Sequence, residues 1–425
     1  MEIVIVLGKD LREVDGGVLM KEQMDKLSGY CWITVGMLWL THTIAHLNYG
    51  ALGTLAPFIK DELNLTSAQI GLFISATSIG SILVQLPAGV LTELVSIRKI
   101  LSGSVLTIGL SAIILSRVSH FWGAILVLLI FGLAFGSINP AAAKTIMGLF
   151  PPAGRATAMG LKQTGVNMGG VLAGVLMPFL AVLFDWRNGF LMVGISEIVC
   201  AGIIYKFCRD PWEKMNDSPS PSSIFSKLRA MSFHKDILLA GGMGIFLITI
   251  QTCFSTYLVL FLTKELDFPI LLAGTYFMIA FFCGAVGRVC WSALSDYFFH
   301  GRRKPVLFIN SLFLVLICSL LGFVPLSSSK QWLILLLIST FGLTGIGWNA
   351  IWITMVGEIL DRESSGLAVA EAFFIGTIGS FVGPPIFGHI VDATNSFAFA
   401  WKFLAISALA VIGLLGLFQE KTRVR

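Results

Sequence analysis

The feature that most constrains this chain is a series of twelve apolar segments, each long enough to cross a membrane. A helix needs about 20 predominantly apolar residues to span the hydrocarbon core. Hydrophobic residues make up 56% of the sequence and charged residues only 12%, whereas ordinary soluble domains contain about 25% charged residues. We therefore expect a multi-pass membrane protein. The segments lie near residues 30–58, 70–91, 100–116, 122–148, 157–183, 189–207, 237–263, 270–294, 305–325, 332–357, 366–390 and 399–418.

These segments are expected to be helices. Only α-helices and closed β-barrels satisfy every backbone polar group in lipid, and the segments lack the alternation of apolar and polar residues that is typical of barrel strands. Four basic residues precede the first segment, and no small-residue cleavage site follows it, so we expect no cleaved signal peptide.

The distribution of lysine and arginine predicts the orientation in the membrane. If the N-terminus is cytoplasmic, the tails and loops on that side contain 20 of the 29 basic residues, six lie on the other side, and three lie within helices. The positive-inside rule then places both termini in the cytoplasm. The net charge of +5 reflects this topology, and we expect no nucleic-acid partner. The seven cysteines lack Cys-x-x-Cys spacing and histidine partners, so they give no redox or metal information. His42 and His46 have the spacing of a zinc pair, but no third ligand at sensible spacing follows, so no metal site or cofactor is expected.

The chain divides into two halves. Residues 208–236 are rich in Ser, Pro and charge, which predicts a cytoplasmic linker with a short amphipathic helix near 224–231. On either side the sequence repeats weakly: "FIKDELNLTSAQIG" matches "FLTKELDFPILLAG" at an offset of 203, and Asn139 matches Asn349 at an offset of 210. We expect an N-terminal tail (1–27), a six-helix bundle (28–207), the linker (208–236), a second six-helix bundle (237–418) and a C-terminal tail (419–425). Such parallel repeats are typical of transporters that rock around a central site.

Two loop sequences carry a resemblance to a known family. "PAGVLTELVSIRK" (87–99) and "WSALSDYFFHGRRK" (291–304) resemble the two copies of the loop signature of the major facilitator superfamily, at matching places in the two halves. "NPAAAKTIMGLFPPAGRATAMGLKQTGVNMGG" (139–170) is similar to prokaryotic members that transport small anions. The resemblance implies an all-α fold of twelve transmembrane helices in two pseudo-symmetric bundles, located in the inner membrane. It also implies that the first, fourth, seventh and tenth helices line a central cavity.

The same resemblance implies a latch on the cytoplasmic side. Glycine permits close helix packing, and an acid at a helix end can face the positive N-terminus of a neighbouring helix. The alternative is that the basic residues are ordinary positive-inside loop charge. The sequence departs from the signature at Glu93, Ile97 and Ser292, which replace the usual Asp and two glycines. The expected gating residues are Gly89, Glu93, Arg98, Asp296, Arg302 and Arg303.

Ionisable residues within membrane helices are expensive and point to function. Arg288 is the strongest candidate, because a guanidinium binds a carboxylate through two parallel hydrogen bonds; the alternative is an internal partner for Asp296. With Lys144 and Lys162, and with Glu371 as the one clear acid, the set is net positive, which favours an anionic substrate. The expected substrate-binding residues are Arg288, Asn139, Asn349, His42, His46, Lys144, Lys162, Gln163, Gln251, Trp348 and Trp352.

His42 and His46 share one face of the first helix. Imidazoles at the cavity could contact substrate and carry protons near neutral pH, and we assign His42, His46 and Glu371 as proton-coupling residues. The alternative is that the histidines only bond to neighbouring carbonyls. Glu197 is expected to be structural or interfacial, because the sixth helix is peripheral in the family.

These features predict a monomeric secondary transporter, not an enzyme, that moves a small organic anion such as a carboxylate by proton symport or anion exchange. One alternative is proton-coupled export of apolar or cationic drugs along a wall formed by Phe254, Trp348 and Trp352. A membrane sensor is the alternative outside transport, although the linker is short for an output domain.

Overall fold

The fold is helical throughout the described part of the chain. A computed structural model describes residues 17–150, 152–208, 234–325, 327–360 and 365–420. Eleven helical stretches in it are long and apolar enough to cross a membrane, and α2 (Gly17–Thr54) covers most of the first apolar segment. The expected amphipathic helix near 224–231 lies outside the described residues, as do most of the linker and the ends of both tails.

The elements fall into two halves. The N-terminal half contains α2 (Gly17–Thr54), α3 (Ala56–Glu62), α4 (Ser67–Leu94), α5 (Ile97–Leu115), α6 (Phe121–Leu149), α7 (Pro152–Phe184) and α8 (Trp186–Phe207). The C-terminal half contains α10 (Lys235–Lys264), α11 (Ile270–Tyr297), α12 (Lys304–Phe323), η1 (Ser328–Lys330), α13 (Gln331–Phe341), η2 (Gly342–Ile346), α14 (Asn349–Gly357), α15 (Ser365–Gly376), α16 (Ile378–Thr394) and α17 (Phe397–Leu417).

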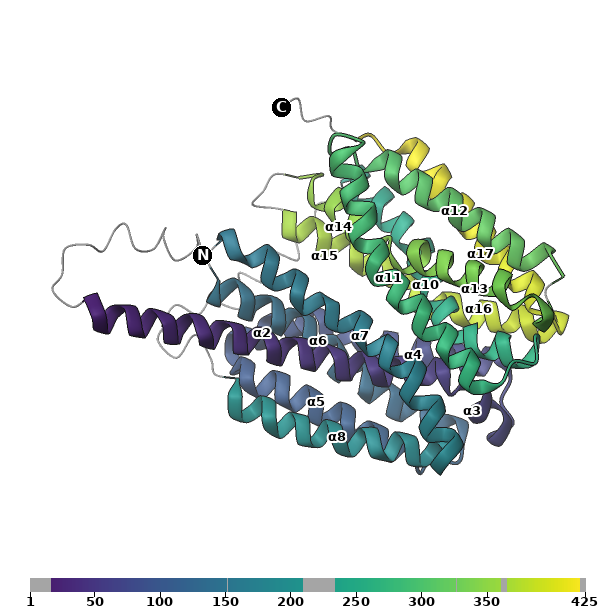
Figure 1. Ribbon diagram of the computed structural model, residues 1–425, viewed down its shortest axis with the longest axis horizontal. Coiled ribbons are helices and arrows are strands. Elements are labelled where there is room, and N and C mark those ends of the chain that lie inside the picture. Colours follow the sequence, from purple (N-terminus) through teal and green to yellow (C-terminus); the bar gives the residue numbers. More distant parts are fainter. Residues whose placement is uncertain (1–16, 151, 209–233, 326, 361–364, 421–425) are drawn as a thin grey trace.

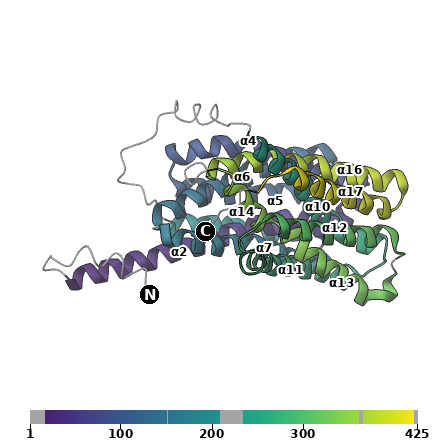
Figure 2. The same cartoon turned by 90° about the horizontal axis from the view of Figure 1, so that it is seen from above.

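Helix pairs build each half and join the two. Within the N-terminal half α4 packs on α6, α2 on α7, and α5 on α8; in the C-terminal half α12 packs on α17 and α10 on α15 and α16. Between the halves α4 packs on α16 and α7 on α11. The halves lie side by side in Figure 1, and Figure 2 shows the same arrangement from above. We call the side where α2 begins and α17 ends the termini side, and the other the opposite side.

The first helix is longer than its apolar segment. It begins at Gly17 and so continues into the expected N-terminal tail. The residues from 18 to 27 include Leu, Met, Lys, Glu and Gln, which are good helix formers. The helix therefore extends beyond the portion that can lie in hydrocarbon.

Two membrane segments depart from regular α-helical hydrogen bonding. Between α13 and α14 the chain forms a π-helix at Gly342–Ile346, and Asn310 Nδ2 donates to the carbonyl oxygen of Thr344 at 3.2 Å. Such π segments are frequent at functional sites. In α16, Pro385 has no N–H for the carbonyl oxygen of Phe381. That oxygen instead accepts a hydrogen bond from Ser75 Oγ of the N-terminal half at 2.6 Å.

Candidate functional site

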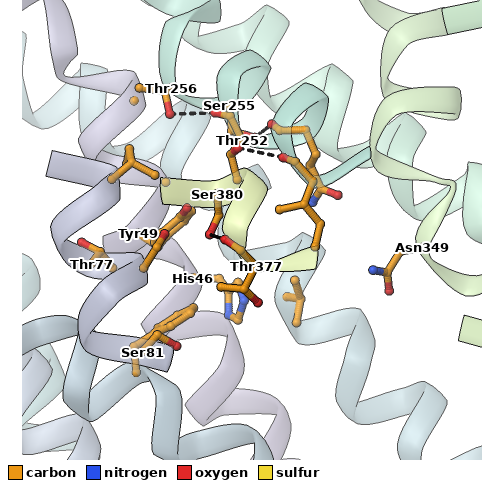
Figure 3. Close-up of a pocket in the computed structure, with 18 of the residues that line it drawn as sticks. His46, Tyr49, Thr77, Ser81, Thr252, Ser255, Thr256, Asn349, Thr377 and Ser380 are labelled. Carbon is orange, nitrogen blue, oxygen red and sulfur yellow. Dashed lines mark hydrogen bonds between the residues drawn. The ribbon is translucent and has the colours of Figure 1, made fainter. Parts of the chain in front are cut away.

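A cavity of about 250 Å³ lies between the two halves. Figure 3 shows side chains from both halves pointing into the space between them, among them His46 and Tyr49 of α2, Thr252 of α10 and Asn349 of α14. The wall comes from α2, α4, α6 and α7 on one side and from α10, α11, α14, α15 and α16 on the other. A ligand in this cavity would therefore contact both moving parts of a two-half protein.

Eight serine and threonine residues line the cavity, although apolar atoms make up most of its wall. Many of them donate their proton within their own helix: Thr252 Oγ1 donates to Ile248, Ser255 Oγ to Gln251, and Thr256 Oγ1 to Thr252, each at 2.7–2.8 Å. A hydroxyl that donates to the helix still has lone pairs with which to accept. The wall thus offers several acceptors for a ligand that itself carries hydroxyl donors. The lining hydroxyl residues are Thr77, Ser78, Ser81, Thr252, Ser255, Thr256, Thr377 and Ser380.

Arg288 supplies a positive charge to this wall. In the described part of the chain no ion pair involves Arg288, and its buried Nε atom has no hydrogen-bond partner. Asp296, the internal partner that the sequence left open, instead forms an ion pair with Arg303. A partly buried guanidinium with unused donors is suited to bind a carboxylate.

Next to the cavity, Asn139 joins two of the candidate residues. Its Oδ1 accepts from Lys162 Nζ at 2.8 Å and lies 3.2 Å from His42 Nε2. Because an ammonium group can only donate, Lys162 fixes which end of the Asn139 amide is oxygen. His42 Nε2 therefore faces an acceptor.

The other nitrogen of each imidazole faces a backbone carbonyl. His42 Nδ1 lies 2.8 Å from the Leu38 oxygen, and His46 Nδ1 lies 2.9 Å from the His42 oxygen. Each Nδ1 must then carry a proton, so Nε2 is the nitrogen that can gain or lose one. On His42 a proton at Nε2 would be stabilised by Asn139 and opposed by the charge of Lys162. His46 lines the cavity itself.

The tryptophans divide between the cavity and the core. Trp348 lines the cavity and donates from Nε1 to Gln251 Oε1 at 3.0 Å, and Asn349 lies beside it. Trp352 donates to the Ala240 carbonyl and is fully buried, so it does not contribute to the cavity wall. Phe254 is also fully buried, stacked on Phe341. Two of the three residues expected for a drug-binding wall are therefore core residues.

Three further candidates do not line the cavity. Gln163 and Lys144 are partly buried on α7 and α6. Glu371 on α15 is buried, and its Oε1 has no hydrogen-bond partner among the described residues. The structure thus brings together Arg288, His46, Gln251, Trp348 and Asn349 at the cavity, and it joins His42, Asn139 and Lys162 in a separate group.

The expected gating residues lie on the termini side. Arg303 pairs with Asp296 and, at 3.4 Å, with Glu358. Arg302 is exposed, whereas the Arg98 guanidinium lies 3.8 Å from the centre of the Tyr205 ring. The side chain of Glu93, and the surroundings of Gly89, lie outside the described residues. Each of these contacts joins residues of the same half, whereas a latch requires contacts between the halves. The latch is therefore still a prediction.

A set of contacts that the sequence analysis missed closes the opposite side. Lys264 of α10 pairs with Asp61 of α3 at 2.6 Å, and Tyr257 Oη lies 2.7 Å from the carbonyl oxygen of Ser67. A Cβ on Gly53 would lie 2.1 Å from the carbonyl oxygen of Ser255, whereas one on Gly36, nearer the termini side, would meet nothing within 4 Å. The two halves therefore touch backbone to backbone on the opposite side.

The two helical halves, with a cavity between them that is lined by Arg288 and several hydroxyl groups, define a membrane transporter of the alternating-access type. A sequence profile described as Major Facilitator Superfamily matches residues 38–384, and the chain belongs to this family.

Curated relatives cover nearly the whole chain. The hexuronate transporter of Bacillus subtilis (strain 168) is 25% identical over 402 residues, which is 90% of this chain and 92% of that one. The probable galactarate/D-glucarate transporter GudP of the same organism is 25% identical over 420 residues, 90% of each chain. The probable sulfoacetate transporter SauU of Cupriavidus necator (strain ATCC 17699 / DSM 428 / KCTC 22496 / NCIMB 10442 / H16 / Stanier 337) is 22% identical over 414 residues, 90% of this chain and 91% of that one.

Solved structures share the fold at lower identity. A bacterial homolog of the human lysosomal transporter Spinster, in an inward-facing and occupied conformation, matches with a TM-score of 0.74 at 17% identity, covering 91% of this chain and 95% of that one. A D-xylose-proton symporter matches with a TM-score of 0.73 at 15% identity, covering 91% and 98%. The expected fold is thereby confirmed.

Proposed function

We propose that this protein transports a small hydroxylated carboxylate, such as a sugar acid, by proton-coupled alternating access. The observation that carries the proposal is the combination of Arg288, with unused donors, and a wall of hydroxyl acceptors in one cavity. The guanidinium would bind the carboxylate, and the acceptors would bind the substrate's hydroxyl groups. The names of the hexuronate and galactarate/D-glucarate transporters are consistent with this chemistry.

Coupling to protons is assigned to the histidines and to Glu371. The proton at His42 Nε2 is stabilised by Asn139 and opposed by Lys162, so an anion bound nearby would favour the doubly protonated ring. His46, which lines the cavity, would then pass protons between the substrate site and water. Anion exchange without a proton is the alternative mechanism, and transport measurements distinguish the two.

We propose that the protein is a monomer in the inner membrane. Both of its termini would lie in the cytoplasm. The positive-inside rule supports this orientation. The opposite side then faces outward, and since the halves are in contact there, the described conformation is the one that opens toward the cytoplasm. The gating residues Gly89, Glu93, Arg98, Asp296, Arg302 and Arg303 would close that side when the protein opens outward.

Binding of D-glucuronate tests the substrate class, with D-glucose as a neutral ligand of similar shape. We expect D-glucuronate, and not D-glucose, to raise the Tm of the wild-type protein; occupancy at 100 times Kd adds about 2.7 kcal/mol. Arg288→Ala and Arg288→Lys should both weaken binding by more than about tenfold, since lysine keeps the charge and loses the paired donors. Arg117→Ala, at an exposed arginine, is the matched control and should bind as wild type does.

Two further outcomes would change the proposal on the carboxylate site or on proton coupling. If D-glucuronate binds the Arg288 variants and the wild type equally, Arg288 is not the carboxylate site. In proteoliposomes, an inward proton gradient should drive accumulation of D-glucuronate, and a protonophore should abolish it. Accumulation that depends only on a second anion inside the vesicles would establish exchange instead.

A further inference from the structure

Glu197 is a fully buried carboxyl group that the transport site does not use. It lies at the middle of α8, on the side that faces α2, and its exposed fraction is 0%. Its Oε2 accepts a hydrogen bond from Asn48 Nδ2 of α2 at 3.0 Å. Its Oε1 has no hydrogen-bond partner among the described residues. The residue is therefore not at the lipid interface, one of the two roles that the sequence allowed.

The surroundings of Glu197 contain no compensating positive charge. From α2 it meets Asn48, and from α5 it meets Gly109, on which a Cβ would lie 2.9 Å from the Glu197 Cβ. α7 packs on α8 near the opposite side through Met177 and Leu180, which are apolar. The nearby titratable group is the thiol of Cys200, one turn along α8. Within the described residues no basic side chain contacts the carboxyl group.

An ionised carboxylate in such a place would be strongly destabilising. Moving a charge out of water costs several kcal/mol even after relaxation, and one amide hydrogen bond does not offset that cost. The carboxyl group is therefore neutral in the described conformation, with the proton carried by the oxygen that Asn48 does not contact. A glutamine would make the same hydrogen bond between α2 and α8 and could never become charged. The acid therefore provides a capacity for ionisation that helix packing does not require.

We propose that Glu197 is a proton-binding site of the transport cycle, occupied in the described conformation and emptied when α2 moves against α8 and admits water to the carboxyl group. The inference rests on the proposed proton-coupled transport and adds to it a site within the N-terminal half. The reaction is loss of one proton from Glu197 to water, which leaves a carboxylate.

Helix α2 connects this site to the cavity. Asn48, which contacts Glu197, is followed by Tyr49, which lines the cavity. Tyr49 stacks on Phe135 at 5.5 Å between ring centres, and Phe135 also contacts the ring of His46 at 4.9 Å. A shift of α2 that accompanies substrate binding would therefore move Asn48 relative to Glu197.

Infrared difference spectroscopy tests the protonation state without any substrate. In the full-length protein in lipid at pH 7, we expect a protonated carboxyl C=O stretching band that is absent from Glu197→Gln and shifted in Glu197→Asp. The matched change Glu371→Gln, at the buried acid of the other half, should leave this band in place. If neither Glu197 variant alters the carboxyl bands, the residue is ionised and the proposal is wrong. The aspartate variant preserves the test if the glutamine variant does not fold.

Cysteine accessibility tests the link to conformation. A cysteine at Thr377, which lines the cavity, would be labelled by an impermeant maleimide in inside-out vesicles, with the accessible native cysteines replaced. In the protein that retains Glu197, we expect the rate of labelling from the termini side to fall as the pH rises. The fall can reach about tenfold per pH unit, which is the limit for one linked proton. In Glu197→Gln labelling should stay high, and the remaining pH dependence should come from the histidines and Glu371. An identical pH profile in both backgrounds would overturn the proposal.

The two experiments separate this inference from the proposed function. If D-glucuronate is not accumulated by the wild type but the pH profile depends on Glu197, the substrate is misassigned and the proton site stands. If a proton gradient drives accumulation equally in wild type and Glu197→Gln, the transport function stands and Glu197 is only a structural acid.

Discussion

The carboxylate of Asp392, at the end of α16 in the C-terminal half, accepts hydrogen bonds from the backbone N–H groups of Ser67 and Ala68 at the start of α4 in the N-terminal half. Both distances are 2.8 Å. The next N–H, that of Gln69, is satisfied within the N-terminal half by Thr66 Oγ1 at 3.2 Å. The N-terminus of α4 is therefore capped jointly by its own loop and by the other half. Since the interaction exists only when the opposite side is closed, it stabilises the closed arrangement.

Asp392→Asn is expected to open the opposite side more often. The amide can still accept one hydrogen bond, but it loses the charge that interacts with the positive end of α4, an effect of about 1–2 kcal/mol in partly buried geometry. The equilibrium between open and closed arrangements should shift by roughly 5- to 30-fold. Distances between spin labels at Ser119 and Ser329, on the opposite side of the two halves, would report the shift by pulsed electron paramagnetic resonance.

Asp185→Asn is the matched control for that change. Asp185 Oδ1 accepts from the backbone N–H of Trp186 at the start of α8, at 2.7 Å, within the N-terminal half. Its replacement removes a helix-capping charge without touching the contact between halves. We expect a small loss of thermal stability and an unchanged distribution of label distances. A shift of equal size in both variants would show that Asp392 acts only on helix stability.

Gly71→Ala should act on the same closure by steric means. A Cβ on Gly71 would lie 2.5 Å from the backbone of Pro384, which is too short for any carbon contact, so α4 and α16 must separate. We expect the distances between the same spin labels to lengthen and transport to fall at least severalfold. Gly103→Ala on α5 is the control, because a Cβ there meets nothing within 4 Å. It should leave transport unchanged, and helix propensity alone would favour it by about 1 kcal/mol.

The fold was predictable from sequence because the membrane imposes it. Lipid requires helices of nearly fixed length, so the twelve apolar segments match the observed helices within a few residues except at α2. Arg288, His46 and Gln251 could be assigned to the cavity because an expensive polar side chain in a membrane helix usually faces a polar space. Trp352 was expected at the cavity for another reason, its closeness to Asn349 along the chain, but it does not line the cavity because its Nε1 atom donates to the Ala240 carbonyl within the core.

The closure of the opposite side could not be predicted in the same way. Asp392 is an ordinary charged residue at a helix end, and nothing in its neighbours along the chain indicates that it caps a helix 325 residues away. The hydroxyl-rich character of the cavity is likewise hidden, because serine and threonine are common in membrane helices. Only the spatial arrangement shows that Thr77, Thr252 and Ser380 line the same cavity.

Asn139→Leu should destabilise the protein mainly through Lys162. The buried Lys162 Nζ would lose the acceptor oxygen of Asn139, and an unsatisfied buried donor costs about 1–3 kcal/mol. A fall of several degrees in the Tm of the purified protein is expected. Asn349→Leu, at the matching position of the repeat, lines the cavity without a described hydrogen bond. It should leave Tm near wild type and weaken D-glucuronate binding, so equal losses of Tm would contradict the assignment.

The Glu62 carboxylate gives a pH dependence whose sign follows from its contacts. It accepts hydrogen bonds from Trp186 Nε1 and, at 2.8 Å, from Arg187 Nε. Partial burial disfavours its charged form, but the hydrogen bonds and the charge of Arg187 outweigh this and hold the pKa of Glu62 below its ordinary value of 4.5. A depressed pKa stabilises the folded protein above the unfolded pKa, and this contribution is lost as the pH falls through the folded value.

The Tm difference between wild type and Glu62→Gln should therefore be present at pH 7 and disappear at strongly acidic pH. The contribution is expected to stay below about 1 kcal/mol, because the side chain is 44% exposed and solvent screens the pair. The double variant Glu62→Gln with Arg187→Gln isolates the pair. In a protein that already lacks Arg187, the effect of Glu62→Gln on Tm should depend much less on pH. A Tm difference that grows toward acidic pH would mean that burial dominates and the pKa of Glu62 is raised.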